Sequence, residues 1–378
     1  MSERRGFERI IGQELAKRVL SRAARAGRPA HSYLFVGMQG TGKFTAAQEF
    51  ARALNCEDLA EEGACGACAI CRSAEHGNFP DVTVWSPGKV RDTSIEQMRE
   101  MRAMANFAPV RGRWRVNIVE QGDTLNAEAA SCILKLMEEP PEYLVNILLY
   151  RNSAAVLPTI RSRCQTVRFT PARADQLASR LAEDYGVDPE RAAFLALFSQ
   201  GRPGTAIRMI DDEGFFARRG EVIAVAEALT SGSPWLALNL AGRLRSTGSA
   251  SSEDDDAGAQ ESEDDGGSEE GETRSPAAPD AGQRRRAGVR EVSLESLDLL
   301  LSWYRDLLAA KLRGSDTAIV NADRREDVVQ QAGRYAHAGP LLGAIDSIQR
   351  ARRAIVGNAN PQISVEAMMM SIRGANNS

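Results

Sequence analysis

The chain has 378 residues, of which 43% are hydrophobic and 26% are charged, the balance of a globular protein with a sizeable core and two or three domains. It has no run of about 20 apolar residues, and the charged segment Met1–Ile10 lacks the apolar core of a signal peptide. We therefore expect a cytoplasmic protein that does not span a membrane. The formal net charge is −4, but eleven acidic residues lie between Glu253 and Glu272, and the remainder carries +7. A mildly basic remainder is compatible with contacts to nucleic-acid phosphates, although solubility alone also explains it.

The first candidate site is a glycine-rich segment, Gly37–Phe44. A helix is expected over residues 7–27, then a short apolar strand, Tyr33–Val36, and an Ala-rich helix over 45–54 directly after the glycines. Strand, glycine loop and helix in this order are typical of a phosphate-binding P-loop, whose backbone N–H groups surround the phosphates at a helix N-terminus. The residues that would bind nucleotide are Gly37, Gly40, Gly42 and Lys43, with Lys43 reaching the outer phosphates.

One position of this loop departs from the motif. Phe44 stands where a Ser or Thr hydroxyl normally binds Mg²⁺. A phenyl ring has no oxygen to offer, so ATP is a candidate cofactor for a loop that lacks one ligand of the metal ion.

Four cysteines follow the loop: Cys56, Cys65, Cys68 and Cys71. In a reducing compartment, clustered cysteines are more often metal ligands than disulfide partners. The two-residue gaps let neighbouring thiolates point at one centre, and four sulfurs complete the tetrahedral coordination of Zn²⁺. We therefore predict a structural zinc module over residues 56–71 with no open position for catalysis. Four unrelated buried thiols are the alternative.

Strands and helices alternate as far as Phe169, which predicts a parallel α/β sheet. Further strands are expected at 81–85, 114–119, 145–150 and 165–169, and helices at 94–104 and 124–139. Ser94 and Gln97 have the spacing of a capping box at the start of the first helix. The methionines that follow them at helical spacing are interpreted as core residues.

A second departure lies at the end of the strand 114–119. P-loop ATPases usually carry Asp-Glu there, to orient the metal ion and to polarise the attacking water. This chain has Glu120 and Gln121. Glu120 could still approach a metal ion, but Gln121 is a neutral amide that cannot accept a proton.

After Pro171 the pattern changes to helices only. A small helical domain is expected from helices at 174–185, 189–199 and 204–210. A third, all-helical part begins near Phe215 and resumes at about Val292, and its closing helices are expected at 336–356 and 365–372.

The segment 246–288 interrupts this last part and consists largely of Ser, Gly, Ala, Asp, Glu and Pro. Such a segment cannot bury enough apolar surface to offset the entropy of ordering it. We therefore expect a disordered insertion that acts as a solvated spacer, with a docking site for a basic partner as the alternative.

Taken together, these residues resemble the AAA+ clamp-loader family of bacterial DNA polymerase III over the whole chain apart from the acidic insertion. The matching blocks are Ile10–Gln13, His31–Phe35, the glycine loop, the four-cysteine module, Asn126–Pro141, Ser162–Cys164 and Asn358–Gln362. The resemblance implies an AAA+ P-loop domain at 1–170, a helical lid domain at 171–212 and a helical collar domain at 213–378.

Two subunit types of this family share the fold. The gamma or tau subunits are motors that hydrolyse ATP, whereas the delta-prime subunit is a stator that does not. Phe44 and Gln121 favour the stator type, and two further positions agree. Tyr150 stands where we align a small hydroxyl residue that senses the γ-phosphate, and Gly204 stands where the motors carry a sensing arginine. We therefore expect a chain that is not an ATPase by itself but is part of a DNA polymerase III complex.

The segment Ser162-Arg163-Cys164 retains the family's pattern. The resemblance implies that Arg163 crosses a subunit interface and acts catalytically in trans on a neighbour's ATP. A planar, permanently charged guanidinium can stabilise the charge that develops during phosphoryl transfer. Without the resemblance, Arg163 would be interpreted as a surface arginine at a strand edge.

The function that the resemblance implies is that of a non-hydrolysing stator in the machine that loads the sliding clamp onto primed DNA. Its partners would be the gamma or tau subunits, the delta subunit, the clamp indirectly and the DNA backbone, through salt-sensitive contacts. One alternative is an active gamma/tau-like ATPase that uses Lys43 and Glu120. The other is a zinc-stapled DNA-binding protein with a relic P-loop, but the sequence lacks a basic stripe with interleaved aromatic residues.

Overall fold

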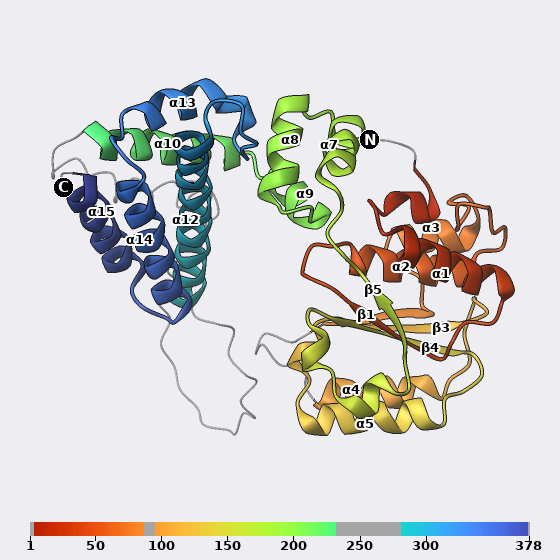
Figure 1. Ribbon diagram of the computed structural model, residues 1–378. Helices are drawn as coiled ribbons and strands as arrows, with labels where there is room; N and C mark the ends of the chain where they lie inside the picture. The colour runs from red at the N-terminus through yellow and green to blue at the C-terminus, as the bar shows by residue number, and fades with distance from the viewer. Residues whose placement is uncertain (1–3, 87–94, 232–280, 377–378) are drawn as a thin grey trace, which may run out of the picture. The chain divides into compact units, whose positions relative to one another are not determined.

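The computed structural model describes residues 4–86, 95–231 and 281–376, and it divides into two compact units, Met1–Asp211 and Asp212–Ser378 (Figure 1). The expected helix cap at Ser94 and residues 246–280 of the expected insertion lie outside the described residues. Within the described ranges, no helix is long and apolar enough to cross a membrane.

The first unit is built on a five-stranded parallel sheet, which confirms the prediction from the alternating pattern. In the order β2-β3-β4-β1-β5, the strands are Val82–Trp85, Arg115–Val119, Leu144–Tyr150, Ser32–Val36 and Gln165–Arg168. Strand β1 pairs with β4 and β5, so that Tyr33 lies opposite Ile147 and Gln165. Every residue of β3 and β4 is buried, because helices cover both faces of the sheet.

Helices pack on both faces of this sheet (Figure 1). One face carries α1 (Glu14–Ala26) and α2 (Lys43–Asn55), and the other carries α4 (Ile95–Ala105) and α5 (Ala127–Glu138). Successive strand residues point to opposite faces, so β1 contributes to both cores. Its Tyr33 packs edge-on against Phe50 in the first core, with ring centroids 5.0 Å apart. Its Leu34 lies in the second core with Met98 and Met101, where the methionines were expected.

The unit has eight further helical segments within its described residues. They are η1 (Gly6–Arg9), α3 (Ala69–Glu75), η2 (Gly122–Thr124), η3 (Ser153–Ala155), α6 (Pro158–Arg161), α7 (Ala174–Tyr185), α8 (Pro189–Phe198) and α9 (Pro203–Asp211). An ion-pair network ties α7 to the start of the chain. Asp184 accepts hydrogen bonds from Arg4 at 2.8 Å and from Arg180 at 2.9 Å, and Arg180 also donates to the Glu8 carbonyl at 3.0 Å.

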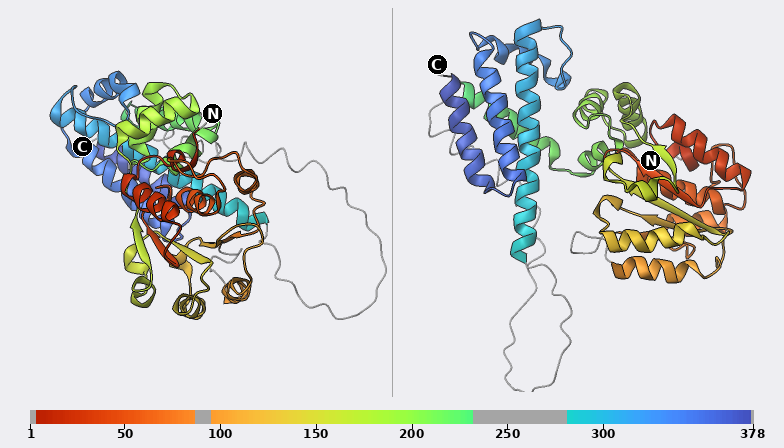
Figure 2. Two further views of the ribbon diagram at one scale, coloured as in Figure 1. Left: turned by 90° about the vertical axis from the view of Figure 1, so that its right-hand side faces the viewer. Right: turned by 60° about the horizontal axis from the view of Figure 1, so that its bottom comes forward.

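The second unit is entirely helical in its described residues. Its segments are α10 (Phe215–Ser231), α12 (Ala281–Arg313), η4 (Ala322–Arg324), α13 (Arg325–Gly333), α14 (Gly339–Val356) and α15 (Pro361–Asn376). Figure 2 shows α12, α14 and α15 running side by side. The fully buried Trp303 of α12 donates its indole N–H to the Gln331 side chain at 2.7 Å, and Gln331 in turn donates to the Ala226 carbonyl at 2.9 Å.

Two helix predictions for this unit are corrected by the structure. Residues 281–288 belong to α12 and not to an unstructured insertion. A docked helix can extend by one hydrogen bond per residue without a new nucleus, and the Arg and Ala residues of this stretch favour helix. Helix α13 was not predicted from the sequence, because its weak amphipathic pattern carries little signal.

One loop of the first unit, residues 106–114, is held by two buried side chains. Asp81 accepts the backbone N–H groups of Val110, Arg111 and Gly112 at 2.6–2.7 Å. Asn55, at the end of α2, accepts those of the next two residues at 2.9 and 2.8 Å. Five successive N–H groups are therefore satisfied by side chains from elements that lie far from them in sequence.

We expect Asp81→Ala to lower the free energy of unfolding by about 3–5 kcal/mol, because it removes the acceptor of three backbone N–H groups and leaves the buried Arg115, 3.7 Å from the carboxylate, without its charge partner. Asp81→Asn keeps one acceptor oxygen and should cost less. Chemical denaturation followed by circular dichroism measures both. The matched control is Asp211→Ala at an exposed position, which should change stability by no more than about 0.5 kcal/mol. Equal effects of the two alanine variants would contradict this account of the loop.

Candidate functional site

The glycine loop lies between β1 and α2, and three of its glycines are required by their surroundings. A Cβ on Gly37 would lie 2.3 Å from the Phe169 carbonyl oxygen, and a Cβ on Gly40 would lie 2.5 Å from the Thr205 hydroxyl. Gly40 and Gly42 also have φ of +82° and +89°, which favours glycine. Gly42 caps α2, so the N-terminus of a 13-residue helix faces the loop.

Lys43 does not extend away from the loop. Its ammonium group donates to the carbonyls of Gly37 at 2.5 Å and Met38 at 2.8 Å, and the residue is 8% exposed. Burial lowers the pKa of this amine to about 8, although the Asp123 carboxylate partly opposes the shift. The lysine therefore uses two of its three N–H donors on the loop's own backbone.

The start of α9 closes over the loop. The Gly204 N–H donates to the Gly40 carbonyl at 2.8 Å, and the side chain of Gln13 donates to the carbonyls of Thr41 at 3.2 Å and Thr170 at 2.6 Å. A Cβ on Gly204 would already contact Gly40 at 3.4 Å. This is an ordinary van der Waals distance, so the backbone hydrogen bond, and not a lack of space for a side chain, defines the contact at Gly204.

A cavity of about 230 Å³ remains beside the loop, lined among others by Lys43, Phe44, Glu120, Gln121 and Arg151. Pockets that bind small ligands usually measure about 300–1,000 Å³, so this cavity is small for a nucleoside triphosphate.

The hydrolytic positions of this cavity are occupied by other interactions. Phe44 packs against the first core and brings no oxygen to the cavity. The Glu120 carboxylate accepts a hydrogen bond from the Ser86 hydroxyl. The Gln121 carbonyl oxygen accepts the Arg151 guanidinium at 3.2 Å. Phe44 therefore offers no hydroxyl to Mg²⁺, and Gln121 cannot take a proton from an attacking water at neutral pH, which leaves Glu120 as the one carboxylate of the three.

The structure corrects the alignment of Tyr150 with a phosphate-sensing residue. Tyr150 is 2% exposed and lies in the second core, where a Cβ on Gly122 would meet its ring at 2.3 Å. Burial raises the pKa of its phenol to about 12. Arg151, which the sequence analysis missed, lines the cavity instead. The sequence held a sign of this, because the buried apolar strand ends at residue 150. Residue 151 is therefore the first after the strand whose side chain can line the cavity.

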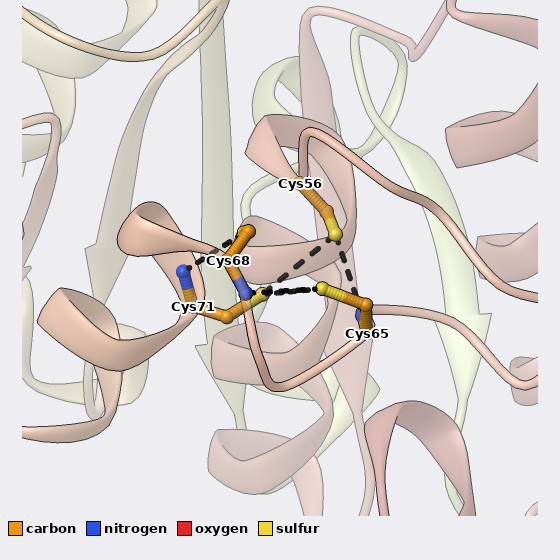
Figure 3. A group of neighbouring side chains, drawn as sticks. All are labelled: Cys56, Cys65, Cys68 and Cys71. Carbon is orange, nitrogen blue, oxygen red and sulfur yellow. Dashed lines mark hydrogen bonds between the residues drawn. The ribbon is translucent and has the colours of Figure 1, made fainter.

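The four predicted cysteines are brought together (Figure 3). Their sulfurs all lie within 4.8 Å of one another, with 4.0 Å between Cys65 and Cys71 and 3.7 Å between Cys71 and Cys56. Four sulfurs at about 2.3 Å from a tetrahedral Zn²⁺ would be about 3.8 Å apart. The spacing and the all-thiol donor set therefore fit a closed zinc site.

Backbone N–H groups point at these sulfurs, as is usual around metal-bound thiolates. Cys56 accepts from the N–H of Cys65, and Cys65 accepts from those of Ala67 and Cys68, at 3.3–3.4 Å. Burial opposes the ionisation of Cys65, but these two donors outweigh it and the pKa of the thiol is lowered to about 7. Burial raises the pKa of Cys71. A bound cation would favour the thiolate form of all four.

The cysteine module also supports the beginning of the chain. The Phe7 N–H donates to the Glu62 carbonyl at 2.8 Å. The Phe7 ring packs so closely on Gly63 that a Cβ at Gly63 would lie 2.9 Å from the ring. The module therefore fixes the segment that leads into α1 and to Gln13, which holds the glycine loop.

Arg163 lies on the surface just after α6, away from the residues that line the cavity. Its side chain is 37% exposed. It donates to the Glu138 carboxylate at 2.9 Å and to the Thr159 carbonyl at 3.2 Å, both on its own chain. The structure thus separates two sets of residues that the sequence analysis assigned to nucleotide chemistry: the loop residues lie together, and Arg163 is exposed elsewhere.

Comparisons with known proteins agree on a family for the first unit. Residues 12–173 match the family described as DNA polymerase III, delta subunit. The chain is 30% identical over 228 residues to DNA polymerase III subunit tau of Bacillus subtilis, covering 59% of this chain and 40% of that protein. It is 34% identical over 198 residues to subunit gamma/tau of Mycobacterium tuberculosis, covering 52% and 34%.

A solved structure of a DNA polymerase III gamma subunit-related protein from Thermotoga maritima has a TM-score of 0.42 at 15% identity, over 94% of this chain and 99% of that one. The chain spans about two fifths or less of the length of the two curated relatives named above. Through its sheet-containing domain, the chain is similar to subunits of DNA polymerase III, among them the delta family and gamma/tau.

Proposed function

We propose that this chain is the non-hydrolysing stator of a DNA polymerase III clamp loader, the role of the delta-prime subunit. The observation that carries the proposal is the contact between Gly40 and Gly204, which closes the glycine loop under the start of α9. The cavity beside the chain's own loop is small and lacks the hydroxyl ligand for Mg²⁺ and the residue that activates water, while Arg163 is exposed.

Three features argue against hydrolysis at this chain's own loop. Lys43 is bonded to the loop's carbonyls, Phe44 offers no metal ligand and Gln121 is no base. Each change alone would weaken catalysis. Together they remove the outer-phosphate contact, the Mg²⁺ ligand and the group that activates water.

Arg163 supports a role at a neighbour's site. An arginine finger must be exposed on its own subunit, positively charged at all pH values and held by short connections. Arg163 meets these conditions, because it follows directly on α6 and donates to α6 and α5. Supplied in trans, it would make ATP turnover depend on a correctly assembled complex.

The proposed assembly includes gamma or tau subunits, a delta subunit, the sliding clamp through those subunits, and primed DNA bound by its backbone. The first unit would combine an AAA+ domain at 1–170 with a lid domain at 171–212. The second unit would be the collar domain, from about residue 213, that holds the subunits together. ATP turnover by this chain itself, and a DNA-binding role without partners, remain the two competing functions.

We also propose that Cys56, Cys65, Cys68 and Cys71 hold a structural Zn²⁺. The ion would cross-link the loop that carries the four cysteines. It would not take part in catalysis, because the four sulfurs fill its coordination sphere. Its effect would reach the glycine loop through Phe7 and Gln13.

Replacement of Arg163 by Ala should lower the DNA-stimulated ATP turnover of the reconstituted complex by about tenfold or more, because the neighbour's site loses charge stabilisation in the transition state. Steady-state kinetics measure the turnover, and size-exclusion chromatography checks assembly. The matched control is Arg161→Ala, an exposed arginine two residues earlier, which should leave turnover unchanged. Unchanged turnover with Arg163→Ala in an intact complex would rule out the finger.

The zinc proposal is tested by metal analysis of the purified chain. We expect one zinc per chain, and Cys68→Ala should abolish it and lower the free energy of unfolding by about 3 kcal/mol or more. Cys132→Ala, at a half-buried cysteine outside the cluster, should keep the zinc. A wild-type chain purified without zinc that cannot take it up would contradict the proposal.

A further inference from the structure

The carboxylate that contacts Arg163 has no evident role in stabilising the fold. Glu138 and Arg163 are 51% and 37% exposed, and ion pairs between such exposed groups contribute little to folding. Glu138 is also the last residue of α5, where a negative charge meets the negative end of the helix dipole. The carboxylate therefore does not stabilise α5, but it lies within hydrogen-bonding distance of the Arg163 guanidinium.

The position of this carboxylate is set by the backbone. Glu139 precedes Pro140, which disfavours helical conformation at Glu139, and its φ of −129° and ψ of 66° end the helix there. Glu138 is therefore held at the terminus of a helix whose buried face packs in the second core. Its Oε1 lies 2.9 Å from Nη2 of Arg163.

A second contact holds the other arm of the guanidinium. Nη1 donates to the Thr159 carbonyl in α6 at 3.2 Å. The two terminal nitrogens are thus held from two helices, α5 and α6. Each of these nitrogens carries a second N–H, and Nε–H makes no hydrogen bond within the described residues, so further donors can reach an acceptor on another molecule.

We propose that Glu138 is the positioning residue for Arg163: it orients the guanidinium on this chain before a neighbour's phosphate arrives. The inference rests on the proposed function, because it assigns Glu138 a part in the same reaction. A long arginine side chain loses rotamer freedom when it engages a phosphate, and a carboxylate that already restricts it reduces that loss at the moment of reaction. Arg163 makes the phosphate contact, and Glu138 acts only through it.

The test uses the reconstituted complex with Glu138→Ala, Glu138→Gln and Glu139→Ala. Glu138→Ala should lower kcat for DNA-stimulated ATP turnover about fivefold, a change of about 1 kcal/mol, with KM for ATP unchanged, since the contact matters in the transition state. Glu138→Gln retains the acceptor oxygen and should recover at least half of the loss. Glu139→Ala removes the same charge one residue along, at an exposed position, and should have no effect.

Adding Arg163→Ala separates this inference from the proposed function. In an Arg163→Ala background, Glu138→Ala should cause no further loss, because the two residues act as one unit. If Arg163→Ala lowers turnover but Glu138→Ala leaves kcat unchanged or raises it, the positioning role is wrong and the stator function stands. If Arg163→Ala has no effect on turnover, both the positioning role of Glu138 and the proposed action of Arg163 at a neighbour's site are wrong. A loss that Glu138→Gln fails to reduce, or that Glu139→Ala reproduces, also overturns the positioning role.

Discussion

The contact between the glycine loop and the start of α9 is the constraint on which the first unit depends. Gly40 and Gly204 meet backbone to backbone, with a hydrogen bond of 2.8 Å, and a side chain on Gly40 would strike Thr205. Gln13 closes the loop from the other side by bonding to both Thr41 and Thr170. The loop is thus held from two sides by its own chain, and the cavity left beside it is small, about 230 Å³.

Two other parts of the first unit hold the segments around this loop. The cysteine module fixes the segment that leads to Gln13, so a structural metal would act on the loop from a distance. The ion pairs of Arg4 and Arg180 fasten α7 to the start of the chain. On the surface of the same unit, α5 and α6 hold the side chain of Arg163, the arginine that we propose acts at a neighbour's site.

Patterns local in sequence predicted much of this molecule. The alternation of strands and helices predicted the parallel sheet. The spacing of the four cysteines between residues 56 and 71 predicted that their side chains cluster. What local patterns could not supply depends on contacts distant in sequence. Arg151, and not Tyr150, faces the cavity because the last strand residue turns into the core, and the Gly40–Gly204 contact joins residues over 160 positions apart. The first turns of α12 were missed because composition alone does not reveal how far a docked helix extends.

The central claim is that the chain's own loop takes no part in ATP turnover. Its most direct test is calorimetric titration of the purified chain, without partners, with Mg²⁺ and a non-hydrolysable ATP analogue. The account predicts no binding at analogue concentrations up to about 1 mM, because the cavity is small and Lys43 is already bonded. Micromolar binding that Lys43→Ala abolishes would contradict the account and support an active motor subunit.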